Sequence, residues 1–261
     1  MDDLRVQQHD NYLEITLNRP EKKNALTAEM LFEIERVLHK YQDSSTVLPV
    51  IIRGSGREYF CSGYNINEIP LEEPAHAERF ALSKPLDHAV EAIESYPYPT
   101  FALLNGSVYG GGCEIAFSCD FRIGLPHIRL CMPPAKIGLI YSINGLKRIA
   151  SVIGISNLKK LIFTAEVVDY HSICKFHAID YEATEENVDQ LIHRLVQTIE
   201  PLSPLSLRGH KTILNSLSTI SVTTCMESIF QKLIQESYLS RDAREGKKAF
   251  LEKRKPVFKG Y

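Results

Sequence analysis

Apolar residues recur along this chain at two different periods, and the two periods alternate in the first half of the sequence. Residues 12–18 alternate between apolar and polar side chains, as a half-buried strand does. Residues 28–41 instead place apolar side chains at helical spacing, and Thr27 before them is a suitable helix N-cap. Residues 47–53 and 100–104 are short apolar runs that end near glycines, and they predict buried strands.

Helical spacing dominates the remainder of the chain. We expect an extended segment at 121–132 and helices at 77–95, 112–119, 143–153, 156–163, 170–175, 185–199, 204–216, 222–239 and 241–254. Strands that alternate with helices, and then give way to helices alone, predict an α/β core followed by a helical region.

The charge balance and the cysteines limit the classes of partner and cofactor. The 261 residues include 30 Lys and Arg against 32 Asp and Glu, a net charge of −2. This balance argues against nucleic acid as a partner, although a local basic patch can still bind a phosphorylated ligand. The six cysteines form no CxxC pair and no zinc-like spacing with histidine, so we expect reduced thiols and no metal site. With no signal-peptide pattern and no apolar run of about 18 residues, we expect a cytoplasmic protein without a membrane segment.

The stretch from residue 103 to residue 120 carries the strongest chemical signal. An apolar strand runs into Gly110, Gly111 and Gly112, and a helix follows directly. Glycines leave backbone N–H groups open to a ligand, and a helix start adds unpaired N–H groups and a positive dipole end. Such a turn suits an anion, or an oxygen that becomes an anion during a reaction. A packing turn in which Glu114 complements the helix dipole explains the same residues.

Two further stretches are weaker signals when taken alone. The small-residue turn at 61–63 precedes a polar segment, and a structural turn is the simpler interpretation. The prolines at 133–134 restrict the chain after an expected strand, and Tyr141 follows them. A single tyrosine in such a place is more often a packing residue than a catalytic one.

Taken together, these stretches resemble the crotonase, or enoyl-CoA hydratase/isomerase, superfamily. The motifs that carry the resemblance are LNRPEKKNALT (17–27), FCSGYNINEI (60–69), NGSVYGGGCEIAFSCDFRI (105–123), PPAKIGLIY (133–141) and EGKKAFLEKRKPVFKGY (245–261). The resemblance implies a spiral of β-β-α units in residues 1–195 and a helical trimerisation region in residues 196–261. It also implies an acyl-CoA substrate and a homotrimer or a dimer of trimers. The hydrophobic pattern alone predicts only an α/β class.

The resemblance also implies roles for particular residues. Backbone N–H groups of Tyr64 and Gly111 would hold the thioester oxygen, where charge develops in an enolate. Coenzyme A would enter as part of the substrate, with no tightly bound cofactor. The residues implied to contact it are Lys22, Lys23, Ala25, Ser62, Asn65, Ile66, Lys253 and Lys255. Solvated surface charge is the alternative interpretation of the four lysines.

The carboxylates bear on which reaction of the superfamily is expected. Hydratases of the superfamily carry one glutamate at the position of Glu114 and a second in a Pro-Glu pair, but here that second position is Pro134. Hydration asks for one group that activates water and another that governs the proton at the neighbouring carbon. A single glutamate with Tyr141 resembles instead the methylmalonyl-CoA decarboxylases of the superfamily. Glu68 is a reserve acid or base.

We therefore expect an acyl-CoA lyase that works through a thioester enolate, with decarboxylation of a malonyl-type or methylmalonyl-type thioester as the specific reaction. Two alternatives stay open at this point. One is an enoyl-CoA hydratase or isomerase that uses Glu114 alone. The other is a CoA-binding protein that has kept the fold and lost turnover.

Overall fold

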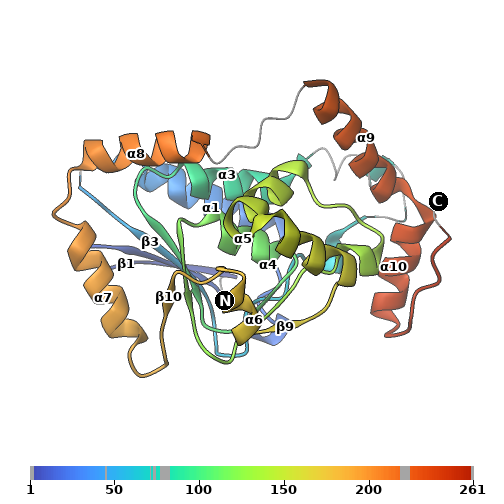
Figure 1. Cartoon of the computed structure of the whole chain (residues 1–261), viewed down its shortest axis with the longest axis horizontal. Helices are drawn as coiled ribbons and strands as arrows, with labels where there is room; N and C mark the ends of the chain where they lie inside the picture. Colours follow the sequence, from blue (N-terminus) through green and yellow to red (C-terminus); the bar gives the residue numbers. More distant parts are fainter. Residues whose placement is uncertain are drawn as a thin grey trace.

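Two β-sheets form the centre of the molecule and helices pack around them (Figure 1). The computed structural model describes residues 3–44, 46–70, 72, 75–76, 83–217 and 224–259. The larger sheet contains, in spatial order, β1 (Leu4–Gln8), β2 (Leu13–Leu17), β3 (Val50–Gly54), β5 (Thr100–Leu104), β7 (Phe121–Gly124) and β10 (Tyr181–Glu182). The smaller sheet contains β4 (Tyr59–Cys61), β6 (Ser107–Tyr109), β8 (Arg129–Cys131) and β9 (Val168–Asp169).

From β3 to β8, successive strands alternate between the two sheets, so the chain advances as a spiral. β3, β5 and β7 pair in parallel in the larger sheet, and β4, β6 and β8, which follow them along the chain, pair in parallel in the smaller sheet. Each strand pair is followed by a helix: α3 (Pro85–Ser95), α4 (Gly111–Ser118) and α5 (Ile143–Thr164). The fold class expected from the sequence, an α/β spiral of β-β-α units, is confirmed.

α1 (Ala28–Tyr41) forms where the hydrophobic pattern predicts it. The Thr27 side chain caps the helix, since its Oγ1 accepts a hydrogen bond from Met30 N at 3.2 Å. The buried side chains of α1 are those at helical spacing, namely Met30, Leu31, Ile34, Val37 and Leu38. They face the core and α3, so the local pattern and the tertiary contacts agree.

Some element boundaries differ from the expected ones for local reasons. The hydrophobic pattern does not predict β1, because only Leu4 of its five residues is buried and its antiparallel pairing with β2 forms it. The helix expected at 185–199 begins later, as α7 (Val188–Ile199), because Asn187 Oδ1 accepts a hydrogen bond from Thr184 N and holds a turn there. Part of the helix expected at 77–95 lies outside the described residues.

The helices after β8 follow the predicted order. Residues 143–153 and 156–163 were expected as two helices, and α5 indeed breaks between them at Gly154, whose φ is 75°. The remaining helices are α6 (Tyr170–Lys175), α8 (Pro204–Leu217), α9 (Thr224–Leu239) and α10 (Arg241–Leu251). The proposed boundary between residues 195 and 196 falls inside α7, and the division into two domains stays a prediction.

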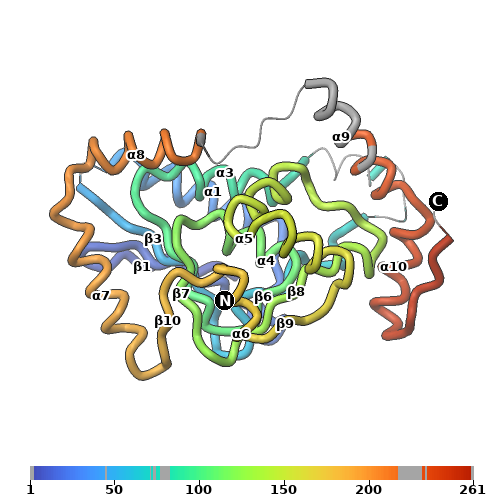
Figure 2. Tube along the Cα trace, in the orientation of Figure 1, coloured from blue at the N-terminus to red at the C-terminus, as the bar shows by residue number. Residues whose placement is uncertain are grey.

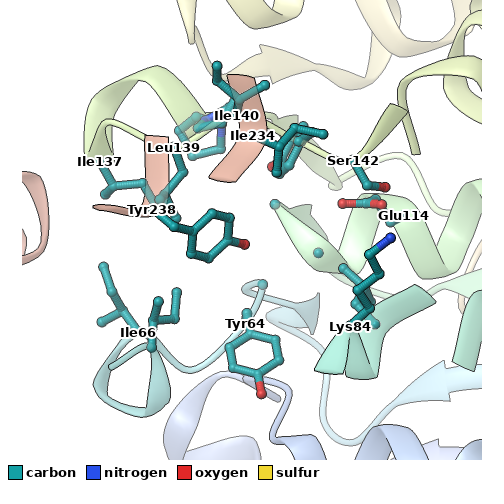
Figure 3. A pocket seen from close by; sticks show the side chains of 18 of the residues that line it. Tyr64, Ile66, Lys84, Glu114, Ile137, Leu139, Ile140, Ser142, Ile234 and Tyr238 are labelled. Atoms are coloured by element: carbon teal, nitrogen blue, oxygen red, sulfur yellow. The ribbon is translucent and has the colours of Figure 1, made fainter. Parts of the chain in front are cut away.

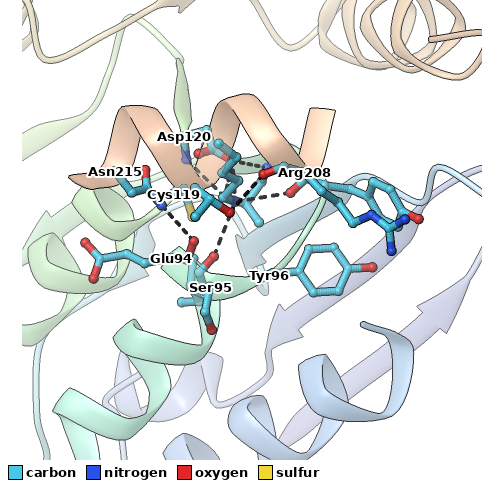
Figure 4. A network of polar contacts seen from close by, with 12 residues as sticks. Glu94, Ser95, Tyr96, Cys119, Asp120, Arg208 and Asn215 are labelled. Atoms are coloured by element: carbon cyan, nitrogen blue, oxygen red, sulfur yellow. Dashed lines mark hydrogen bonds and ion pairs between the residues drawn. The ribbon is translucent and has the colours of Figure 1, made fainter. Parts of the chain in front are cut away.

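A partly buried ion pair joins α8 to the core (Figure 4). Lys211 of α8 donates to Asp120 Oδ2 at 2.7 Å and to the carbonyl oxygen of Tyr98 at 3.1 Å. Asp120 also accepts from Thr100 N at 2.8 Å, and Asn215 of α8 donates to the carbonyl oxygen of Glu94 at 2.9 Å. The first half of the helical region is therefore packed on the strands and helices of the spiral.

The second half of the helical region lies at the other end of the molecule. Figure 2 shows α9 and α10 on the side opposite α7 and α8. α10 packs against η3 (Pro134–Ile137), and Lys247 of α10 donates to the carbonyl oxygen of Ile69 at 2.6 Å. α9 contacts α5 and α10. These contacts leave a cavity between the spiral and the C-terminal helices.

Candidate active site

A cavity of about 280 Å³ lies where the ends of the spiral elements face α9 and α10 (Figure 3). Its wall is largely apolar and carries a small set of polar groups, as ligand sites usually do. The polar and glycine residues that line it are Ser62, Gly63, Tyr64, Lys84, Asp87, Gly110, Gly111, Glu114, Lys136, Tyr141, Ser142, Gln231 and Tyr238. The apolar side includes Ile66, Ile69, Leu139, Ile140 and Ile234.

Two glycine turns meet backbone to backbone at this cavity. Gly63 has a φ of 102° and Gly110 a φ of 54°, conformations that favour glycine. A Cβ placed on either glycine would lie 3.6 Å from the Cα of the other. A Cβ on Gly111 would lie 3.5 Å from Tyr64 N, so the backbone nitrogens of both predicted donor residues border the same small space.

Three helices begin at this cavity. Lys84 is the N-cap residue of α3, Gly110 of α4 and Ser142 of α5, and all three residues line the wall. The first turn of a helix leaves backbone N–H groups without partners inside the helix and carries a partial positive charge. The convergence of three such ends makes the cavity favourable for negative charge.

Glu114 projects from α4 into this cavity and is only 2% exposed. The pKa of its carboxyl group is raised to about 8: burial is the main cause, the guanidinium of Arg148 opposes it, and the charge of Asp87 adds a smaller increase. Arg148 is itself held by Glu94, with Nε–Oε1 and Nη2–Oε2 distances of 2.6 and 2.8 Å. Glu114 Oε2 has no hydrogen-bond partner among the described residues. At neutral pH the carboxyl group is therefore mostly protonated.

Tyr141 lines the same cavity just before the start of α5. A Cβ placed on Gly110 would lie 3.6 Å from the Tyr141 hydroxyl, so this hydroxyl lies beside the glycine turn of α4. Burial is the main cause that raises the pKa of Tyr141 well above its usual value, and the neighbouring Cys113 and Glu114 add to it. The hydroxyl stays protonated and can donate a hydrogen bond to a ligand.

The residues expected to contact coenzyme A are only partly brought together. Ser62 and Ile66 line the cavity, and the loop that holds Lys22, Lys23 and Ala25 runs beside them. This adjacency rests on hydrogen bonds such as Ser62 N to the carbonyl oxygen of Lys23, at 3.0 Å. Both lysines of the loop are exposed.

Other expected residues lie farther from the cavity wall. Asn65 caps η2 (Ile66–Glu68), and its Nδ2 donates to Glu68 Oε1 at 2.8 Å. Glu68 is exposed and does not line the cavity. Lys253 and Lys255 follow α10, are exposed and do not line it either, so their contact with coenzyme A stays a prediction.

Sequence reasoning missed six polar residues of this cavity: Lys84, Asp87, Lys136, Ser142, Gln231 and Tyr238. Ser142 Oγ donates to Asp87 Oδ1 at 3.2 Å, which joins the start of α5 to the first turn of α3. Helical spacing at 77–95 predicts a helix that includes α3, but nothing local marks Lys84 and Asp87 as facing a site. Tyr238 comes from α9, more than a hundred residues beyond Glu114.

Within the described part of the chain, no group of three His, Cys, Asp or Glu side chains could hold a metal ion. No helix described is long and apolar enough to cross a membrane. Four cysteines, Cys61, Cys113, Cys119 and Cys131, are buried free thiols, and Cys174 is half-buried.

Comparison with known proteins decides the family. The enoyl-CoA hydratase/isomerase family profile matches residues 7–261. The chain belongs to the enoyl-CoA hydratase/isomerase family. As a member of this family, which is the crotonase superfamily of the resemblance above, it is an enzyme that acts on acyl-CoA thioesters.

Relatives within the enoyl-CoA hydratase/isomerase family point to two different reactions. YngF of Bacillus subtilis (strain 168), assigned by name to the enoyl-CoA hydratases/isomerases, is 31% identical over 247 residues, which cover 94% of each chain. A structure of methylmalonyl-CoA decarboxylase with 2-nitronate-propionyl-CoA has a TM-score of 0.90 at 26% identity, and covers 100% of this chain and 99% of its own. The same enzyme with 2S-carboxypropyl CoA has a TM-score of 0.90 at 25% identity, with the same coverage.

Proposed function

We propose that the protein is a lyase that removes carbon dioxide from a malonyl-type or methylmalonyl-type CoA thioester through a thioester enolate. The observation that carries this proposal is the cavity itself, which joins a buried, protonated Glu114 to Tyr141. Pro134 stands in its wall, at the position where the resemblance puts a second glutamate. The likeness to structures of methylmalonyl-CoA decarboxylase supports the same reaction.

The two glycine turns provide the oxyanion hole of the proposed reaction. The backbone N–H groups of Tyr64 and Gly111 donate to the thioester oxygen. When the bond between the carboxylate and the α-carbon breaks, its electron pair moves into the enolate and charge builds on that oxygen. Loss of one such donor typically raises the barrier by about 2.7–4 kcal/mol.

Tyr141 orients the substrate carboxylate in this scheme. Its hydroxyl lies beside the glycine turn and keeps its proton, so it can donate to a carboxylate attached to the α-carbon. Decarboxylation is fastest when the breaking bond is perpendicular to the plane of the thioester, and a fixed hydrogen bond can hold that orientation.

Glu114 supplies the proton that completes the reaction. Carbon dioxide leaves with the carboxylate oxygens, the enolate retains the electron pair, and the Glu114 carboxyl gives its proton to the α-carbon. The product is the shortened acyl-CoA, and the Glu114 carboxylate is then reprotonated from solvent. A carboxyl group with a pKa of about 8 is in the correct protonation state for this role at neutral pH.

A second candidate is an enoyl-CoA hydratase or isomerase. The specific observation in its favour is Asp87, a further carboxyl group in the cavity wall that accepts a hydrogen bond from Ser142. Glu114 and Asp87 together supply the two acid–base groups that hydration asks for. The name of the relative YngF supports this candidate.

The two candidates are separated by product analysis. Purified protein is incubated with methylmalonyl-CoA and, separately, with crotonyl-CoA, and the acyl-CoA products are identified by mass spectrometry. We expect propionyl-CoA from the first substrate and little change in the second. Tyr141→Phe should lose most of the decarboxylation, while a hydratase would tolerate that change. Fast formation of hydroxybutyryl-CoA with methylmalonyl-CoA untouched would overturn the proposal.

We extend the proposal to substrate binding and assembly. The loop with Lys22, Lys23 and Ala25, which is hydrogen-bonded to Ser62 of the cavity wall, and the turn with Asn65 would hold the phosphates and adenine of coenzyme A. The helices after residue 195 would assemble the chain into a homotrimer or a dimer of trimers, with Lys253 and Lys255 near the bound coenzyme. Light scattering coupled to size-exclusion chromatography tests the assembly.

A further inference from the structure

Lys84 is a cation in the cavity wall that the proposed reaction leaves without a role. Figure 3 shows its side chain on the same side of the cavity as Glu114 and Ser142 and pointing toward them. The residue is half-buried. No ion pair or hydrogen bond joins its ammonium group to any residue that the structure describes. An ammonium group that is partly removed from water without a counter-ion is unfavourable, and a bound anion relieves that cost.

The backbone at Lys84 is also unusual. Its φ of 43° and ψ of 50° are left-handed, and Pro85 follows directly as the first residue of α3. Residues other than glycine rarely adopt this conformation, and such positions are concentrated at functional sites. The left-handed turn places the lysine at the beginning of the helix, where its side chain projects into the cavity.

The surroundings of Lys84 favour a negative ligand. The helices that start at Lys84, Gly110 and Ser142 all point their positive ends at the cavity. Glu114 is mostly neutral at neutral pH, so it adds little negative charge there. Asp87 is the remaining acidic residue of the described wall, and it accepts a hydrogen bond from Ser142. Lys136 also lines the cavity, but its side chain is exposed.

We propose that Lys84 binds a carboxylate carried by the acyl group and so restricts this enzyme to CoA thioesters with an anionic acyl chain. This inference rests on the proposed function, because a malonyl-type thioester has such a carboxylate, but it concerns binding and not bond breaking. In the transition state the negative charge moves from the carboxylate to the thioester oxygen. The contact with Lys84 is therefore strongest in the ground state, so it sets affinity and specificity and does not accelerate the chemical step.

The test measures binding without turnover. The dissociation constants of 2S-carboxypropyl-CoA and of propyl-CoA, which lacks the carboxylate, are compared by calorimetry for the wild type, Lys84→Met and Lys84→Arg. A hydrogen bond to a charged group predicts that Lys84→Met weakens binding of the carboxylated analogue about 10- to 100-fold and leaves propyl-CoA unchanged. Lys84→Arg should keep most of the preference. Lys159→Met, which replaces an exposed lysine of α5 outside the cavity, is the matched control.

The kinetic counterpart is a split between KM and kcat. With methylmalonyl-CoA, Lys84→Met should raise KM by the same 10- to 100-fold and leave kcat unchanged or higher, because a contact that weakens in the transition state does not contribute to kcat. Equal dissociation constants for the carboxylated analogue in the wild type and in Lys84→Met would overturn the inference. A loss of kcat at constant KM would also overturn it.

The outcomes separate this inference from the proposed function. A wild type that releases no carbon dioxide, but prefers the carboxylated analogue in a manner that depends on Lys84, would refute the decarboxylation and support the inference. Efficient decarboxylation with no effect of Lys84→Met on binding would support the proposed function and refute the inference about Lys84. A melting temperature for each variant establishes that the folded protein is compared.

Discussion

Gly145 packs against the carboxyl group of Glu114 so closely that a Cβ at position 145 would overlap Glu114 Oε2. The first turn of α5 can approach the buried carboxyl only because this residue has no side chain. Gly145 N also donates to Ser142 Oγ at 3.0 Å, which fixes the turn in place. The position of the proposed proton donor on α4 is therefore set by a glycine of another helix.

Gly145→Ala should displace the Glu114 carboxyl and lower kcat on the order of 100-fold, since a misplacement of about 1 Å can have that effect. Steady-state kinetics with methylmalonyl-CoA measure it. Gly209→Ala is the control, because a Cβ on this glycine of α8 would have nothing within 4 Å. The control should keep wild-type kinetics. Wild-type kcat in Gly145→Ala would show that the close packing does not position Glu114.

Glu114 should make the protein less stable as the pH rises through neutrality. Its pKa is raised from 4.5 to about 8 in the folded chain, so between these values the folded state binds one proton more than the unfolded state. The free energy of unfolding then falls by at most about 1.4 kcal/mol per pH unit in that window, and by nothing further above pH 8. Glu114→Gln should remove this dependence.

Urea unfolding of the wild type and of Glu114→Gln between pH 5 and 9 measures this dependence. The Gln variant should gain in relative stability as the pH rises to about 8, and the difference should then level off. Parallel curves for the two proteins would mean that the carboxyl group is ionised in the folded state.

The same ionisation should distinguish the two candidate reactions. A decarboxylase that uses protonated Glu114 loses kcat/KM for methylmalonyl-CoA as the pH rises above about 8. A hydratase that needs the ionised carboxylate to activate water gains kcat/KM for crotonyl-CoA over the same range. Whether kcat/KM falls or rises above pH 8, measured with each substrate, therefore identifies the protonation state of Glu114 that is active.

The backbone donor of Gly111 can be removed without removing a side chain. Gly111 is the first residue of α4, a position that accepts proline, so Gly111→Pro should keep the helix and lose the N–H. We expect a loss of about 100- to 1,000-fold in kcat. Gly111→Ala keeps the N–H, and its Cβ would have ordinary contacts of 3.4 Å or more. Equal losses in both variants would indicate blocked space and not a missing donor.

Lys211 should be important for stability and not for chemistry. Lys211→Met leaves the partly buried Asp120 without its cation, and the loss of a hydrogen bond between charged groups costs about 1.5–3 kcal/mol. Chemical denaturation measures the loss. The double variant Lys211→Met with Asp120→Asn should recover part of it, because the unpaired charge is gone. A loss below about 0.5 kcal/mol in the single variant would mean that the pair does not fasten α8.

The features that could be predicted from the sequence are local ones. Thr27 and the apolar stripe behind it give α1, since capping and helical spacing are decided within about four turns of chain. The glycine turn and Glu114 likewise belong to one short motif. The two helices expected at 143–153 and 156–163 are also local features, and α5 breaks at Gly154 between them.

The features that could not be predicted depend on tertiary packing. Lys84 and Tyr238 reach the cavity from α3 and α9, and no periodicity links them to Glu114. The contact between Gly145 and Glu114 is equally invisible, because it joins two helices across a turn of the spiral. The hydrophobic pattern does not predict β1, because this strand forms through pairing with β2 and not through burial of its side chains.

The buried thiols of Cys61, Cys113 and Cys119 can report on local opening of the fold. Burial raises the pKa of Cys61 and Cys119 to about 12 and that of Cys113 well above its usual value. Alkylating reagents react with accessible thiolates, so these three side chains are unreactive in the closed fold. Alkylation of any of these thiols requires the core to open locally, so the rate of alkylation measures how often the core opens. Mass spectrometry of timed alkylation would thus compare how often β4 and α4 open with and without a bound thioester.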